Sequence, residues 1–120
     1  MISCFPKDKF DFYVHADKKS NIFDEITRSE NVYFADRTDV RWGQFSQVEA
    51  TLSIFRMINV DKYCYVHLIR GNDFIIKNPK EFIAFFENNG REFIDSSILP
   101  GTSTWTWHGK TNTRCIIHNG

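Results

Sequence analysis

Short apolar runs alternate along this chain with segments that carry the start signals of helices, and this alternation limits the folds open to it. Strand, helix, strand, helix, strand is the order of α/β proteins, in which right-handed crossovers make the sheet parallel. The apolar runs predict strands, and the segments between them have helical periodicity. We expect strands at 10–16, 31–34, 63–69 and 91–95, a short helix at about 20–27, and longer helices at 46–59 and from 78 to a stop at Asn89-Gly90.

The run 63–69 is almost entirely apolar, which predicts a central parallel strand covered on both faces. Cys64 lies inside this run, and we expect it to be a buried small hydrophobe.

Both longer helices have a recognisable first turn. Ser46 and Glu49 have the spacing of a capping box, in which each side chain reaches the backbone N–H of the other residue. Asn78 stands at the N-cap of the second helix, with Pro79 and Glu81 in its first turn. The buried faces are expected to carry Val48, Leu52, Phe55 and Ile58 in the first helix and Phe82, Ile83 and Phe86 in the second.

Charge and cysteine usage exclude several classes of function. Fifteen basic residues balance fifteen acidic ones, so we expect no nucleic acid or membrane recognised through bulk charge. No apolar run approaches the roughly 18 residues of a membrane span, and no transmembrane segment is expected. The widely spaced Cys4, Cys64 and Cys115, and histidines without metal-ligand spacing, indicate neither a disulfide framework nor a metal site.

The polar turns that follow the predicted strands are the candidate site, because ligands bind outside the carboxyl ends of parallel strands. His15 and Asp17 share one face at the first of these ends. An Asp there can accept hydrogen bonds from a ribose or from a uracil N–H; alternatively, it is a solvated turn residue. Gly71, Asn72 and Asp73 follow the run 63–69 and form either a binding turn or an ordinary tight turn.

Arg41, Trp42 and Gly43 lie in the loop before the first long helix. Together they offer a guanidinium, a stacking surface and a glycine that allows close approach, a combination that suits sugar recognition. The alternative is that Arg41 ties the loop to Asp36 or Asp39 while Trp42 fills the core.

Three stretches, taken in order, resemble the core-2/I-branching glycosyltransferases. They are Val14-His15-Ala16-Asp17-Lys18-Lys19-Ser20, then Val40-Arg41-Trp42-Gly43 with Val48-Glu49-Ala50, and Tyr65-Val66-His67-Leu68-Ile69 with Gly71-x-Asp73-Phe74. This is the β-1,6-N-acetylglucosaminyltransferase family, glycosyltransferase family 14, which also contains the peptide O-xylosyltransferases. The resemblance covers residues 1–97, so we expect a partial glycosyltransferase domain there and a loop or divergent tail over 98–120.

The resemblance implies an incomplete GT-A-like, Rossmann-type nucleotide-binding fold with a mostly parallel sheet. It also implies inverting transfer of N-acetylglucosamine or xylose from a UDP-sugar, which is a substrate, to a glycan or other hydroxyl acceptor. No cofactor and no metal is required, in keeping with the lack of an Asp-x-Asp pair in the sequence. Asp17 and Asp73 match donor contacts of the family. Together with the strand-end and loop residues identified above, the expected donor-binding residues are His15, Asp17, Arg41, Trp42, Gly43, Gly71 and Asp73.

The family's catalytic carboxylate is a Glu that lies well beyond residue 97, so the resemblance assigns no catalytic residue to this chain. The chain is therefore expected to be a fragment, inactive by itself, of a glycosyltransferase. A non-catalytic nucleotide- or glycan-binding module and an inactive truncated gene product are the alternatives. If the chain is bacterial, we expect a cytoplasmic location or one peripheral to a membrane.

Overall fold

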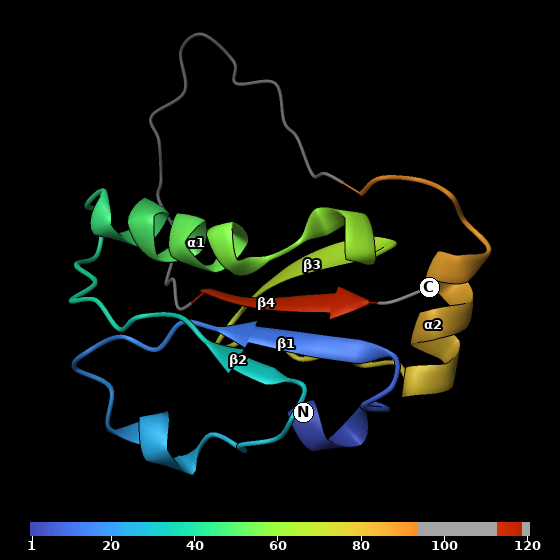
Figure 1. Ribbon diagram of the computed structural model, residues 1–120, viewed down its shortest axis with the longest axis horizontal. Coiled ribbons are helices and arrows are strands. Elements are labelled where there is room, and N and C mark those ends of the chain that lie inside the picture. Colours follow the sequence, from blue (N-terminus) through green and yellow to red (C-terminus); the bar gives the residue numbers. More distant parts are fainter. Residues whose placement is uncertain (94–112, 119–120) are drawn as a thin grey trace, which may run out of the picture.

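The structure is a computed structural model that describes residues 1–93 and the main chain of 113–118 (Figure 1). The elements are η1 (Ile2–Cys4), β1 (Phe10–Val14), η2 (Asn21–Glu25), β2 (Val32–Phe34), α1 (Ser46–Met57), η3 (Val60–Lys62), β3 (Tyr65–Arg70), α2 (Pro79–Glu87) and β4 (Thr113–His118), where η marks a 3-10 helix. The predicted alternation of strands and helices is confirmed. None of the helices within the described part of the chain is long and apolar enough to cross a membrane.

The described strands form one four-stranded sheet in the order β2-β1-β4-β3. β1 and β2 are parallel, whereas β4 is antiparallel to both of its neighbours. The sheet is therefore mixed. β1, β2 and β3 run in the same direction, as expected of a mostly parallel sheet, whereas β4 runs against them. β4 comes from the segment 98–120, which was expected to be a loop or divergent tail, and it enters the sheet between β1 and β3.

The strand β3 lies at one edge of this sheet, not at its centre. Its side chains are half-buried or exposed, and Leu68 is 52% exposed. An unbroken apolar run indicates a strand but does not determine its neighbours, and Cys64, just before β3, is exposed rather than buried. Residues 91–93 of the predicted fourth strand are not in a strand, and 94–95 lie outside the described residues.

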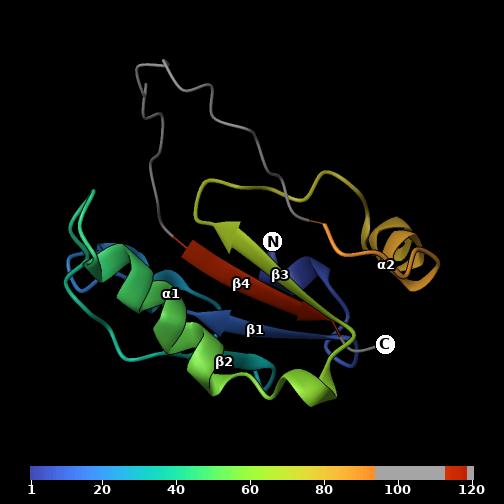
Figure 2. The same cartoon turned by 90° about the horizontal axis from the view of Figure 1, so that it is seen from above.

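The strand β1 carries the core on both of its faces, and every residue in it is buried. On one face, Phe10, Phe12 and Val14 form a cluster with Phe5 and Val32, against which Phe82 and Ile83 of α2 pack. On the other face, Tyr13 packs with Ala35, which follows β2, with Ile54 of α1 and with Ile58, which follows α1. The helices α1 and α2 thus cover opposite faces of the sheet, as Figure 2 shows.

Both helices begin where they were predicted to begin, but only α2 has the predicted cap. The Asn78 Oδ1 atom accepts a hydrogen bond of 3.0 Å from the Glu81 N–H, and Gly90 has a φ of +54° just after the helix. In α1 no side chain caps the N-terminus. Ser46 Oγ accepts instead from the N–H of Arg41, at 2.9 Å, so the hydroxyl closes the preceding loop.

The buried face of α1 also differs from the predicted one. Ala50 and Ile54 are buried, whereas the expected Val48, Leu52 and Phe55 are 47%, 40% and 38% exposed. Ile58 is buried but follows the helix, which ends at Met57. The apolar residues at helical spacing are numerous enough to define two stripes, and packing on Tyr13 and Ala35 selects the stripe through Ile54.

Candidate functional site

The carboxyl ends of β1, β2 and β3 lie together at one end of the sheet. We call this end the carboxyl edge, as distinct from the lateral edge that β3 forms. Val14 pairs with Phe34 on one side and with Arg114 on the other, and Arg114 also pairs with Ile69. Val14 and Ile69 are therefore level with each other, separated by about 10 Å because two strand spacings lie between them. This register places the segments that follow the three strands, with the turns at 15–20 and 71–73, on the same edge.

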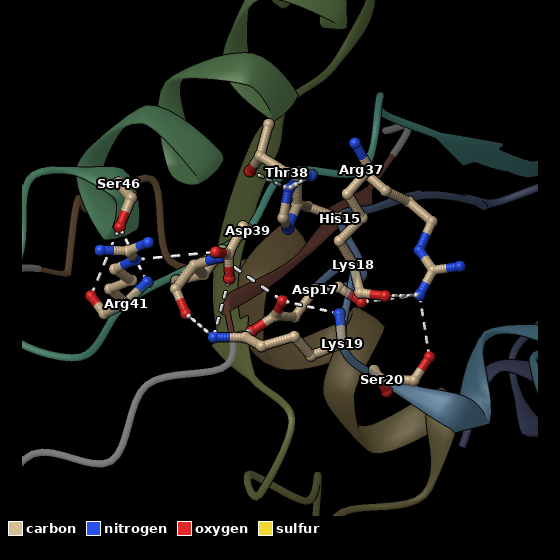
Figure 3. A network of polar contacts seen from close by, with 11 residues as sticks. His15, Asp17, Lys18, Lys19, Ser20, Arg37, Thr38, Asp39, Arg41 and Ser46 are labelled. Atoms are coloured by element: carbon tan, nitrogen blue, oxygen red, sulfur yellow. Dashed lines mark hydrogen bonds and ion pairs between the residues drawn. The ribbon is translucent and has the colours of Figure 1, made fainter.

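Polar contacts join the segment that leaves β1 to the segment that leaves β2 (Figure 3). The main chains meet where the Lys18 N–H donates to the Thr38 carbonyl at 3.0 Å. The His15 Nε2 atom lies 2.9 Å from Thr38 Oγ1 and accepts the Thr38 N–H at 3.3 Å. Because Nε2 is an acceptor, the ring proton is on Nδ1. Burial lowers the pKa of His15, the charge of Asp17 raises it and that of Arg37 lowers it again, so the imidazole is neutral at pH 7.

Asp17 bridges the same two segments through one of its carboxylate oxygens. Its Oδ1 accepts the Lys19 N–H at 3.0 Å and the Val40 N–H at 3.4 Å. Its Oδ2 lies 3.8 Å from Lys19 Nζ, and the side chain is 18% exposed. Asp17 is therefore not the fully solvated turn residue of the alternative interpretation, because backbone N–H groups occupy one of its carboxylate oxygens.

Asp39 lies between two cations at the rim of this network. It contacts Lys19 Nζ at 2.8 Å and Arg41 Nε at 3.6 Å. The hydrogen bond between Lys19 and Asp39 raises the pKa of Lys19 and lowers that of Asp39, so both groups are charged at neutral pH. Lys19 also donates to the Val40 carbonyl at 2.8 Å. The pair of Arg41 with Asp39 is the loop tie that the sequence analysis gave as an alternative role for this arginine.

Trp42 and Gly43 form the tip of the loop before α1. Trp42 is 64% exposed, so the alternative in which it fills the core is wrong. Gly43 has a φ of +71°, a conformation that L side chains rarely adopt, and its N–H donates to Gln47 Oε1 at 3.0 Å. The loop thus presents a large aromatic ring beside a backbone position that has no Cβ.

The turn after β3 is closed by Asp73. Its Oδ2 accepts the Arg70 N–H at 2.7 Å, and its own N–H donates to the Arg70 carbonyl at 3.0 Å. The residue is exposed. These contacts are those of a tight turn. They use Oδ2 of the carboxylate, and the residue stays exposed to solvent at the same edge as Asp17.

Two basic members of the network, Arg37 and Lys19, are not among the site residues predicted from the sequence, and neither is Thr38. Arg37 Nη2 donates to the carbonyls of Asp17, Lys18 and Ser20 at 2.8, 3.0 and 2.8 Å. The available signal was a basic residue at the exit of each strand. Such residues are common on protein surfaces, and only the fold shows that these two reach across to the neighbouring segment.

Residues 1–118 match the family model described as Core-2/I-Branching enzyme. No curated protein and no solved structure matches the chain. Because the match spans nearly the whole sequence, this chain belongs to the core-2/I-branching enzyme family of glycosyltransferases, as the resemblance predicted. Membership of a glycosyltransferase family implies a sugar donor and an acceptor as substrates.

Proposed function

We propose that this chain binds the nucleotide of a UDP-sugar at the shared edge of β1, β2 and β3. The reaction would be an inverting, metal-independent transfer of N-acetylglucosamine or xylose to a glycan or other hydroxyl acceptor. The observation that carries the proposal is the register of Val14, Arg114 and Ile69. It brings the two turns that resemble the family's donor motifs to the two sides of one strand.

Each proposed donor contact has a suitable atom available. The Oδ2 atom of Asp17 is an acceptor for a uracil N–H or a ribose hydroxyl, since backbone N–H groups occupy Oδ1. The exposed ring of Trp42 offers a stacking surface, and Gly43 allows close approach of a sugar to the backbone. His15 contributes a neutral ring that holds Thr38, and the turn from Gly71 to Asp73 lies across the edge.

Three cations of this edge, Lys19, Arg37 and Arg41, already have partners within the described residues. Lys19 and Arg41 share Asp39, and Arg37 binds three carbonyls. A diphosphate without a metal needs positive groups directed at it, because it carries about two negative charges. We therefore infer that the 120-residue chain by itself binds UDP weakly and transfers no sugar, and we assign its carboxylates no role as general base.

One observation favours a second candidate, a non-catalytic nucleotide- or glycan-binding module. Asp17 and Asp73 each accept backbone N–H groups, which hold both carboxylates in place as hydrogen-bond acceptors. Carboxylates held in this way suit the recognition of N–H and O–H groups.

Calorimetric titration of the purified chain with UDP, uridine and ADP tests the proposed site. We expect weak binding of UDP that ADP does not reproduce and that a chelator does not abolish. Asp17→Asn should weaken it about tenfold, while Asp24→Asn, an exposed carboxylate on η2, should leave it unchanged. Equal binding of ADP and UDP, or an unaltered affinity in Asp17→Asn, would refute the donor site.

Transfer assays with UDP-N-acetylglucosamine and UDP-xylose separate the two candidates. Binding without release of UDP from either donor supports a binding role for this chain alone. Metal-independent turnover would show that the inference of inactivity is wrong, and its loss in Asp73→Asn would then give that residue a role in the reaction.

A further inference from the structure

Arg37 makes an unusual set of contacts for a residue at a strand exit. One nitrogen, Nη2, lies 2.8 to 3.0 Å from the carbonyl oxygens of Asp17, Lys18 and Ser20. The nitrogen has two N–H protons, so three acceptors share two donors and surround the group. A single side chain from the β2 exit therefore fixes almost the whole turn that follows β1, as Figure 3 shows.

A second contact holds the guanidinium from another direction. Its Cζ atom lies 4.5 Å from the centroid of the Phe23 ring, which in turn packs edge-on against Phe34 of β2. A planar guanidinium can stack on a ring and donate in its own plane at the same time, whereas an ammonium group has no such plane. The two contacts together specify arginine at this position.

The turn that Arg37 fixes is the one that carries Asp17. Within it, the Ser20 N–H donates to the Asp17 carbonyl at 2.9 Å, and the Lys19 N–H donates to the Asp17 carboxylate at 3.0 Å. If the carbonyls of this turn were released, both amides would lose the geometry that directs the carboxylate toward Val40 and the edge of the sheet.

We propose that Arg37 is a positioning residue, which holds the turn 17–20 so that the Asp17 carboxylate stands at the donor-binding edge. This inference rests on the proposed function for its consequence in binding, but the positioning itself concerns the free protein. Arg37 acts through the turn and makes no contact with the nucleotide.

Hydrogen exchange in the free 120-residue chain tests the positioning directly. Arg37→Lys keeps the charge, and we expect the Lys19 and Ser20 amides to exchange about tenfold faster than in the wild type. The Phe12 amide, which donates to the Asn31 carbonyl at 2.8 Å in the core of the sheet, reports global opening and should change less. Equal acceleration at all three amides, or none at Lys19 and Ser20, overturns the proposal.

Arg28→Lys is the matched control, because Arg28 also lies over the Phe23 ring, at 5.0 Å, yet binds none of these carbonyls. It should leave the exchange of Lys19 and Ser20 unchanged. Phe23→Leu keeps Arg37 but removes the aromatic ring on which its guanidinium lies, and we expect a smaller acceleration of exchange at the same two amides. This second variant decides the question if Arg37→Lys does not fold.

A double-mutant cycle then tests whether the position of the turn matters for the donor. Arg37→Lys should weaken UDP about tenfold in the wild-type background and less than about twofold when Asp17→Asn is already present. Equal losses in both backgrounds would contradict action through Asp17. If the wild-type chain does not bind UDP at all, the proposed function fails, while the exchange experiment still decides the role of Arg37.

Discussion

The phenol of Tyr63 donates a hydrogen bond of 2.6 Å to Oδ2 of Asp11, a buried carboxylate on β1. Tyr13 Oη lies 3.0 Å from the Tyr63 oxygen, and Lys62 Nζ lies 3.4 Å from the same Asp11 oxygen. This network fastens the segment before β3 to the central part of the sheet. Asp11 is thereby provided with the donors that a buried charge requires.

Tyr63→Phe is expected to destabilise the protein by about 1–3 kcal/mol, because it leaves the buried Asp11 carboxylate without its shortest hydrogen bond. Urea unfolding measures the change. Tyr65→Phe is the control and should cost less than about 0.5 kcal/mol. The Tyr65 ring packs on Phe86, and the loss of the hydroxyl leaves that ring contact in place.

The same network predicts a loss of stability in alkali. Burial raises the pKa of Tyr63, and the hydrogen bonds with Asp11 and Tyr13 raise it further. A raised pKa means that the folded state holds the proton more tightly than the unfolded state, so this stability is present below about pH 10 and is lost as the pH rises above it. Tyr63→Phe should flatten the decline, and an unchanged slope would contradict the assignment to this residue.

Ile54 and Leu52 test which face of α1 is buried. Ile54→Ala is expected to cost about 2–5 kcal/mol, because the side chain is fully buried against Tyr13 and Ala35. Leu52→Ala removes a residue that is 40% exposed and should cost less than about half as much. The free energies of unfolding in denaturant decide between the two stripes, and the reverse order would support the face predicted from the sequence.

Local signals in the sequence predicted the elements of this fold better than their arrangement. The strands at Phe10–Val14 and Val32–Phe34 and the cap at Asn78 follow from alternation and from side-chain chemistry within a few residues. The position of β4 between β1 and β3 depends on pairing across about 100 residues of chain, which no local pattern specifies.

The same distinction holds for the candidate site. The sequence placed His15, Asp17 and the loop of Arg41 at strand ends, and the structure brings His15, Asp17 and Arg41 into one network. It could not show that Arg37 crosses to three carbonyls or that Ser46 closes a loop instead of capping α1. Those contacts depend on how two strand exits face each other. Whether these residues bind a donor remains a prediction.

Asn78 and Ser46, the two residues predicted to cap helices, should respond differently to truncation to Ala. Asn78→Ala should lower the stability by about 1 kcal/mol, since it removes the acceptor of the Glu81 N–H. Ser46→Ala should instead loosen the loop before α1, because its Oγ accepts from Arg41. We expect faster exchange of the Arg41 amide in Ser46→Ala with the first turn of α1 unaltered, and a frayed first turn of α1 would contradict this interpretation.

The neutral imidazole of His15 predicts a loss of stability in mild acid. Its pKa is lowered in the folded state, mainly by burial, so the unfolded chain binds the proton more readily. The stability is therefore complete above about pH 6.5 and falls as the pH drops below that value. His15→Gln should remove this component from urea unfolding curves compared on the two sides of about pH 6.5, and an identical pH dependence in the variant would assign it elsewhere.

Trp42 is 64% exposed, so its contribution to binding can be measured separately from its contribution to stability. Trp42→Ala should leave the free energy of unfolding within about 0.5 kcal/mol of the wild type. If the indole stacks on the donor, as we propose, the affinity for UDP or for the UDP-sugar should fall about tenfold, which corresponds to the loss of roughly 1.4 kcal/mol of binding free energy. Trp42→Phe keeps an aromatic surface and should retain most of the affinity. Calorimetric titration measures both variants, and a Trp42→Ala protein that binds as the wild type does would place the donor away from this loop.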